Sequence, residues 1–116
     1  MTWLWASALL MVLTAAIHSF FGEKRLIIPL LAQDKTVLTQ PLSRKVVRFA
    51  WHFTSLLMIV SAALVVWPGT PDGLVLFAGG AWLAVGVADA IFTRGQHIGW
   101  PFLSAAGLFA ILGGVL

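Results

Sequence analysis

Four long apolar runs, separated by shorter polar segments, dominate the pattern of hydrophobic and polar positions along the chain. They cover about residues 2–21, 46–67, 73–93 and 98–116. Each run is close to the roughly 20 residues that a helix rising about 1.5 Å per residue needs to cross a hydrocarbon core of about 30 Å. The runs lack the alternating polarity of a membrane β-strand. The pattern therefore predicts an all-α fold with four transmembrane helices.

The polar connections predict how these helices are arranged. Those at residues 68–72 and 94–96 are short enough to make consecutive helices antiparallel. The first connection, residues 22–45, is longer and contains a short apolar segment, LIIPLL, at residues 26–31. We expect this segment to extend the first helix or to lie in the membrane interface, stopped by Pro29. Residues 1–116 should thus form a single domain, an integral membrane antiparallel four-helix bundle.

The composition agrees with a membrane protein, because 60% of the 116 residues are hydrophobic and only 9% are charged. So few charges cannot coat a soluble domain of this size. No Lys or Arg precedes the first run, which is also too long for the core of a signal peptide, so we expect it to be a mature helix. The lack of cysteine excludes disulfides, thiolate metal sites and redox pairs, and the lack of tyrosine excludes a tyrosyl proton donor.

The charges are unevenly placed, and their positions predict the orientation in the membrane. The net charge is +3, and six of the seven basic residues lie in or beside the first connection: Lys24, Arg25, Lys35, Arg44, Lys45 and Arg48. The seventh, Arg94, lies between the third and fourth runs. The positive-inside rule then predicts a multi-pass protein of the cell membrane with a cytoplasmic basic loop at 22–45 and both termini on the non-cytoplasmic side. We expect the basic loop to contact anionic headgroups of the lipid bilayer, and no nucleic acid.

Tryptophans and small residues add detail to the predicted helices. Trp3, Trp5, Trp51, Trp67 and Trp100 lie near helix ends, as interfacial anchors do, whereas Trp82 lies in mid-helix and should pack against a neighbour. Small residues recur every four positions at Gly80, Ala84, Ala88 and at Ala106, Ala110, Gly114. Such stripes let helices approach closely, either within the chain or in a homo-oligomer.

The predicted topology brings the ionisable residues of the helices to one membrane level. These residues are His18, His52, Asp89 and His97, all near predicted cytoplasmic helix ends. A rise of about 1.5 Å per residue places the first three roughly 7 to 10 Å inside the charged boundary. Ionisable groups in lipid tend to face a bundle interior, so we expect one polar cluster. Glu23 lies at the boundary and could reach His18 only if the helix ends or unwinds near Gly22.

Three imidazoles with carboxylates match the ligand preferences of Zn, Fe or Mn. The candidate metal ligands are His18, His52, Asp89, His97 and Glu23. Alternatively, two facing imidazoles among His18, His52 and His97 could hold haem b axially. Each residue also has a purely structural interpretation. His52 and Arg48 could contact headgroups, Asp89 could pair with Arg48 or Arg94, and His97 could be a solvated residue at a helix start.

Three classes of function follow from these residues. The leading hypothesis is a membrane protein that binds a transition metal or haem, with an oxidoreductase or a hydrolase as the enzymatic forms. The second is a proton-linked transporter or channel subunit using His18, His52 and Asp89 as a relay, and the third is a structural or accessory subunit in which the cluster fixes helix pairing. A 116-residue bundle should have little room for a substrate pocket, so a large substrate would need a homo-oligomer or lateral entry from lipid.

Three segments carry a resemblance to a known group of proteins. They are HSFFGE at 18–23, RFAWHFTS at 48–55 and QHIGWP at 96–101. With these segments the chain resembles small four-helix proteins of the bacterial inner membrane that have no assigned function, a resemblance that covers nearly the whole chain. It implies the four-helix architecture and no particular chemistry. The size is also similar to that of small multidrug transporters, but the first helix lacks a mid-membrane glutamate, since Glu23 lies at its edge.

Overall fold

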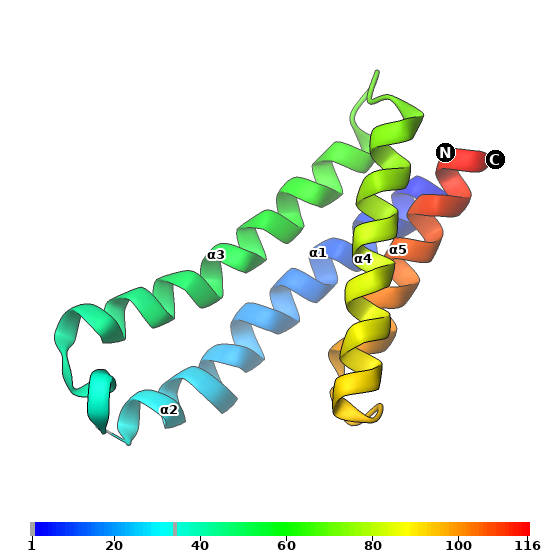
Figure 1. Ribbon diagram of the computed structural model, residues 1–116. Helices are drawn as coiled ribbons and strands as arrows, with labels where there is room; N and C mark the ends of the chain where they lie inside the picture. Colours follow the sequence, from blue (N-terminus) through cyan, green and yellow to red (C-terminus); the bar gives the residue numbers. More distant parts are fainter. Residues whose placement is uncertain (1, 34) are drawn as a thin grey trace.

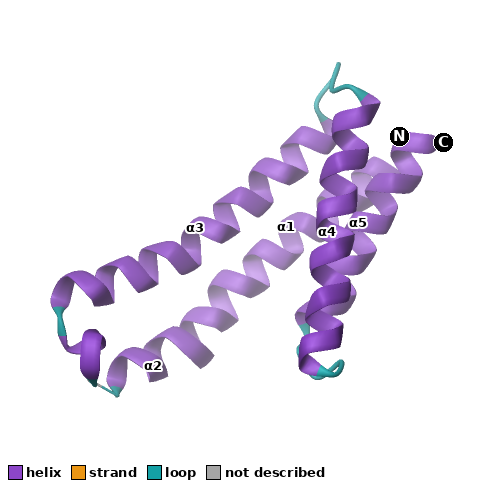
Figure 2. Ribbon diagram, in the orientation of Figure 1, coloured by secondary structure: helices purple, strands orange, loops and turns teal. Residues whose placement is uncertain are grey.

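The computed structural model describes residues 2–33 and 35–116, and every regular element in these ranges is a helix, as Figure 2 shows. The long helices are α1 (Thr2–Gly22), α3 (Pro41–Val66), α4 (Asp72–Thr93) and α5 (Gly99–Val115). The all-α prediction is confirmed. The helical stretch that begins with α1, together with α3 and α4, is long and apolar enough to cross a membrane, whereas α5 is apolar but has 17 residues.

The first helix is longer than its apolar run predicts. A π-helical turn, η1 (Glu23–Ile27), and a short helix, α2 (Ile28–Ala32), continue α1 without a break, so that the helical stretch runs from Thr2 to Ala32. Pro29 therefore does not stop the helix. Proline lacks the N–H that would bond to the carbonyl four residues back, and the wide turn just before it accommodates that missing bond.

The first connection is correspondingly short. A 3-10 turn, η2 (Thr36–Thr39), precedes α3, and α3 begins at Pro41 because proline fits the first turn of a helix. The guanidinium of Arg44 fastens the connection by donating hydrogen bonds to the carbonyl oxygens of Leu31 at 2.6 Å and Leu38 at 3.1 Å. Arg44 and Lys45, which were predicted for the loop, thus lie in the first turns of α3.

The four long helices form two pairs, as Figure 1 shows. Helix α3 runs back along α1, α5 runs back along α4, and the two pairs meet where α1 packs against α5. Helices α3 and α4 follow each other in sequence, yet they barely contact. Both termini lie at the same end of the molecule. The pairs diverge from the α1–α5 contact, and this divergence creates the cavities described below.

Close packing between α4 and α5 depends on glycine. A Cβ atom added to Gly79 would lie 2.9 Å from the Cβ of Ala110, and one added to Gly86 would lie 2.6 Å from the backbone nitrogen of Ser104. Ala106 and Ala110 are buried, as their predicted stripe requires. On α4, however, Gly79, Trp82 and Gly86 form the buried face, whereas Gly80 has no atom within 4 Å of an added Cβ.

Candidate functional site

The polar residues between α1 and α3 form one hydrogen-bonded group, which we call the α1–α3 polar cluster. It consists of Ser19, Glu23, Arg48, His52 and Ser55. Nε2 of His52 donates to the Glu23 carboxylate at 2.8 Å, and Nδ1 of His52 lies 2.9 Å from the Ser19 hydroxyl oxygen. The Ser19 hydroxyl donates to the buried Ser55 hydroxyl at 2.6 Å. The cluster therefore links the two helices over several turns.

The Glu23 carboxylate is fully engaged within this cluster. Arg48 donates to both of its oxygens, at 3.0 to 3.2 Å, in the fork geometry that guanidinium and carboxylate groups favour. The π-helical turn begins at Glu23. A wider turn thus follows Gly22 directly, and the Glu23 carboxylate bonds to His52 and not to His18.

His18 bonds to a residue that the sequence pattern assigned to the interface, Trp51. The Trp51 indole N–H donates to the His18 carbonyl at 2.9 Å, and Nε2 of His18 lies 3.1 Å from the Trp51 carbonyl. The two rings stack with centroids 4.0 Å apart. Trp51 fits against α1 because Gly22 has no side chain, and an added Cβ would overlap the indole. Trp51 therefore joins two helices, in addition to lying near a helix end.

The neighbours of His18 define its tautomer. The Thr54 hydroxyl donates its proton to the Trp51 carbonyl at 2.6 Å, so its 2.8 Å contact with Nε2 of His18 requires the proton on that nitrogen. Nε2 of His18 is thus a donor directed at α3. His18 cannot coordinate a metal through Nε2 without losing these contacts.

Asp89 and His97 form a separate pair where α4 turns into α5. Nδ1 of His97 donates to Oδ2 of Asp89 at 2.7 Å, and the His97 backbone N–H donates to the Thr93 hydroxyl at 3.3 Å. The imidazole lies over Gly99, where an added Cβ would be 2.9 Å from its Cε1 atom. Asp89 bonds to neither of its predicted arginine partners. Nε2 of His97 has no hydrogen-bond partner among the described residues.

The five predicted metal ligands are thus divided between these groups. Glu23 and His52 belong to the α1–α3 polar cluster, His18 bonds to Trp51, and Asp89 and His97 form their own pair. Within residues 2–33 and 35–116, no three His, Cys, Asp or Glu side chains lie close enough together to hold a metal ion. A shared site for Zn, Fe or Mn stays a prediction that this geometry does not favour.

A cavity of about 550 Å³, which we call the main cavity, lies between α1 and the start of α5. His18 lines it from α1, His97 and Phe102 line it from the α5 side, and Arg25 lines it from η1. The lining is predominantly apolar and aromatic. This volume lies within the range of about 300 to 1,000 Å³ that small-molecule sites occupy. The expectation of little room for a pocket is therefore wrong, because the two helix pairs diverge.

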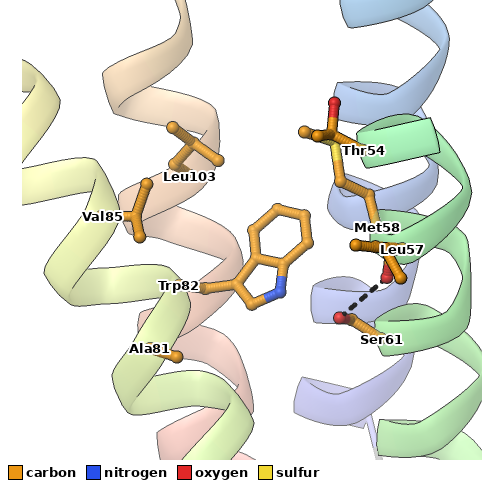
Figure 3. A pocket seen from close by; sticks show the side chains of 8 residues that line it. All are labelled: Thr54, Leu57, Met58, Ser61, Ala81, Trp82, Val85 and Leu103. Carbon is orange, nitrogen blue, oxygen red and sulfur yellow. Dashed lines mark hydrogen bonds between the residues drawn. The ribbon is translucent and has the colours of Figure 1, made fainter. Parts of the chain in front are cut away.

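A smaller cavity of about 240 Å³, the side cavity, lies where α3 and α4 face each other without close contact. Trp82 projects from α4 toward α3 across this space (Figure 3). On α3, the Ser61 hydroxyl bonds back to the carbonyl of Leu57 within its own helix. Met58 and Leu103 line both cavities. The two spaces therefore adjoin, with the side chains of Met58 and Leu103 between them.

Comparison of the chain with protein-family models, with curated proteins and with solved structures finds no match.

Sequence reasoning missed three features of this site. Trp51 was assigned to the interface, Ser19 and Ser55 were not linked, and Arg25 was assigned to a loop. The pairing of Ser19 with Ser55 had one available signal, because each serine lies three or four positions from a histidine or glutamate on its own helix face. The sequence contains no comparable signal for the position of Arg25, since that position depends on the unexpected continuation of α1.

Proposed function

We propose that this chain is an integral membrane protein that binds an amphipathic small molecule in the main cavity. The observation that carries the proposal is a cavity of about 550 Å³ with an apolar and aromatic lining that includes a few polar groups, Thr14, His18, Arg25 and His97. Binding sites for small molecules commonly combine such a lining with a few polar groups that orient the ligand.

The distribution of charge supports a definite orientation in the bilayer. The basic residues of η1, the first connection and the start of α3 would face the cytoplasm, and both termini would lie on the other side. In this orientation Arg25 lies at the boundary of the hydrocarbon core. The ligand would place an anionic or strongly hydrogen-bonding head near Arg25 and its apolar part among residues such as Phe102.

The adjoining cavities support entry from the bilayer. A ligand with a large apolar part is concentrated in lipid, and the gap between α3 and α4 opens to the lipid phase in a membrane-spanning arrangement. From there it would pass Met58 and Leu103, the two residues that line both cavities.

A second role, helix pairing, is favoured for the α1–α3 polar cluster. Every buried polar side-chain atom among the described residues has a hydrogen-bond partner, and the carboxylate of Glu23 is shared between Arg48 and His52. Satisfied polar groups of this kind stabilise helix association in lipid. A proton relay is less favoured, because the hydrogen-bonded chain ends at Ser55 on α3.

The binding proposal is tested with the full chain purified in detergent and a fluorescent long-chain fatty acid as the probe. We expect saturable binding with one site per chain. Leu103→Trp should fill the junction of the cavities and weaken binding about tenfold, a change of about 1.4 kcal/mol. Leu108→Trp is the matched control, because Leu108 lies on the same helix with 45% of its surface exposed. Non-saturable uptake, or equal binding by both variants, would contradict the proposal.

A further inference from the structure

The number of ligands that the chain can offer limits the kind of metal centre it could hold. A bare Zn ion in a protein takes three or four protein ligands, and the described residues bring no such group together. An iron porphyrin requires far less of the protein, because the macrocycle supplies the equatorial nitrogens and the protein adds one or two axial ligands. A single well-placed histidine is therefore sufficient.

His97 has the arrangement that an axial ligand requires. Its Nδ1–H is donated to the Asp89 carboxylate at 2.7 Å, so in the neutral ring Nε2 carries the lone pair. Histidines that bind metals commonly donate their other ring nitrogen to a carboxylate, which fixes the tautomer and raises the basicity of the ligand. Gly99 leaves space for the ring, and His97 itself lines the main cavity.

His18 lines the opposite wall of the main cavity but is committed elsewhere. Its Nε2 proton is directed at the Trp51 carbonyl and the Thr54 hydroxyl, and its ring stacks on Trp51. The two histidines therefore differ. In its neutral form His97 has the lone pair on the distal nitrogen, whereas the distal nitrogen of His18 serves the contact between α1 and α3.

The remaining lining suits a porphyrin with acidic side chains. Phe21, Trp51 and Phe102 supply aromatic surface for a flat macrocycle, and Arg25 also lines the cavity. The Arg25 guanidinium lies 5.0 Å from the centre of the Phe21 ring. Guanidinium groups bind carboxylates in a bidentate manner, which is the interaction that a porphyrin propionate would make.

We propose that the ligand of the main cavity is an iron porphyrin such as haem b, with Nε2 of His97 as its axial ligand. Asp89 is a positioning residue that holds His97 in the required tautomer, and Arg25 pairs with a propionate. This inference rests on the proposed function, because it names the ligand of the same cavity. Haem is itself amphipathic, with an apolar macrocycle and two carboxylates at one edge.

The test is a titration of the purified full chain with hemin, followed by visible absorption. We expect saturation at one hemin per chain with the spectrum of histidine-ligated iron. His97→Gln should remove that spectrum and weaken binding about tenfold or more, and Asp89→Asn should weaken it about tenfold, as loss of an outer-shell carboxylate does. His52→Gln is the matched control, since His52 belongs to the α1–α3 polar cluster and should leave both spectrum and affinity unchanged.

Chemical rescue with imidazole distinguishes iron ligation by His97 from a purely structural role of this residue. In His97→Gly, added imidazole should restore the spectrum, which a merely destabilised protein would not allow. Hemin binding by His97→Gln with an unchanged spectrum would overturn the inference. If the fatty acid probe binds saturably but hemin does not, the inference fails and the proposed function stands. If neither binds, both fail.

Discussion

His18 and Trp51 each place a ring nitrogen against the backbone carbonyl of the other residue, and their rings stack 4.0 Å apart. This reciprocal contact joins α1 and α3 at the level where the wide turn η1 begins. It also withdraws Nε2 of His18 from any ligand. The contact leads to a direct test of what holds the two helices together.

Trp51→Phe should weaken the α1–α3 pair while keeping an aromatic ring. The variant loses the hydrogen bond to the His18 carbonyl, which is worth about 0.5 to 1.5 kcal/mol in folded proteins. We expect a loss of unfolding free energy of that size, measured by denaturant titration in detergent. Trp67→Phe serves as the control because Trp67 is 68% exposed at the far end of α3. An equal loss in both variants would contradict the assigned role of Trp51.

Gly22→Ala should destabilise the protein although alanine is the better helix former. An added Cβ would overlap the indole of Trp51, which its hydrogen bond holds in place, and overpacking of this kind costs about 1 to 3 kcal/mol. Gly80→Ala is the matched control, because an added Cβ there meets no atom within 4 Å. That change should be neutral or stabilising by up to about 1 kcal/mol. Thermal unfolding of the two variants in detergent should therefore shift in opposite directions.

The contact between Ser19 and Ser55 predicts an engineered disulfide. Their hydroxyl oxygens are 2.6 Å apart, so cysteines at both positions should reach the S–S distance of about 2.05 Å after small adjustments. The chain contains no cysteine, so the introduced pair is the sole source of a bond. Oxidation of the Ser19→Cys, Ser55→Cys variant should give an intramolecular crosslink, detected as a shift in electrophoretic mobility.

The control for this crosslink pairs Ser19→Cys with Ser61→Cys. Ser61 lies on α3 but lines the side cavity, away from Ser19. Equal crosslinking of the two pairs would mean that α1 and α3 slide or separate, and the assigned register of the helices would then be wrong.

The proposed orientation predicts opposite labelling of two turns. A cysteine replacing Lys35 should react with a membrane-impermeant maleimide only after the cytoplasmic face of the membrane is opened. A cysteine replacing Thr70, in the turn between α3 and α4, should react in intact cells or right-side-out vesicles. The reverse pattern would invert the positive-inside assignment and place Arg25 at the other face.

The helices themselves could be predicted from the sequence with good accuracy. The four apolar runs agree with α1, α3, α4 and α5 to within a few residues at most ends, because helix formation in an apolar segment depends on local composition and length. The largest differences surround the first connection. Pro29 was expected to stop the first helical segment but is accommodated by a wide turn, and α3 begins at Pro41, ahead of the predicted start at residue 46.

Partners of the polar residues were predicted less well. Sequence reasoning correctly expected Trp82 to pack against a neighbour and Ala106 and Ala110 to lie on a close-packed face. It could not determine which carboxylate pairs with which histidine, because the answer depends on the rotation of each helix and on the π-helical turn at Glu23. A single polar cluster was expected because the ionisable residues of the helices lie at the same predicted depth in the membrane. In the structure these residues are divided between two carboxylate–histidine pairs.

The sequence by itself determined the helical class, the approximate helix limits, the segregation of basic charge and the buried positions Ala106 and Ala110 of α5. These properties follow from composition and from the 3.6-residue period of the helix. Only the tertiary structure decided that the helices form two diverging pairs, that Trp51 bonds to His18, and that His97 reaches a cavity with its distal nitrogen unpaired. The physical reason is that contacts between helices depend on the crossing geometry, which close approaches such as Gly79 to Ala110 set and which no single helix encodes.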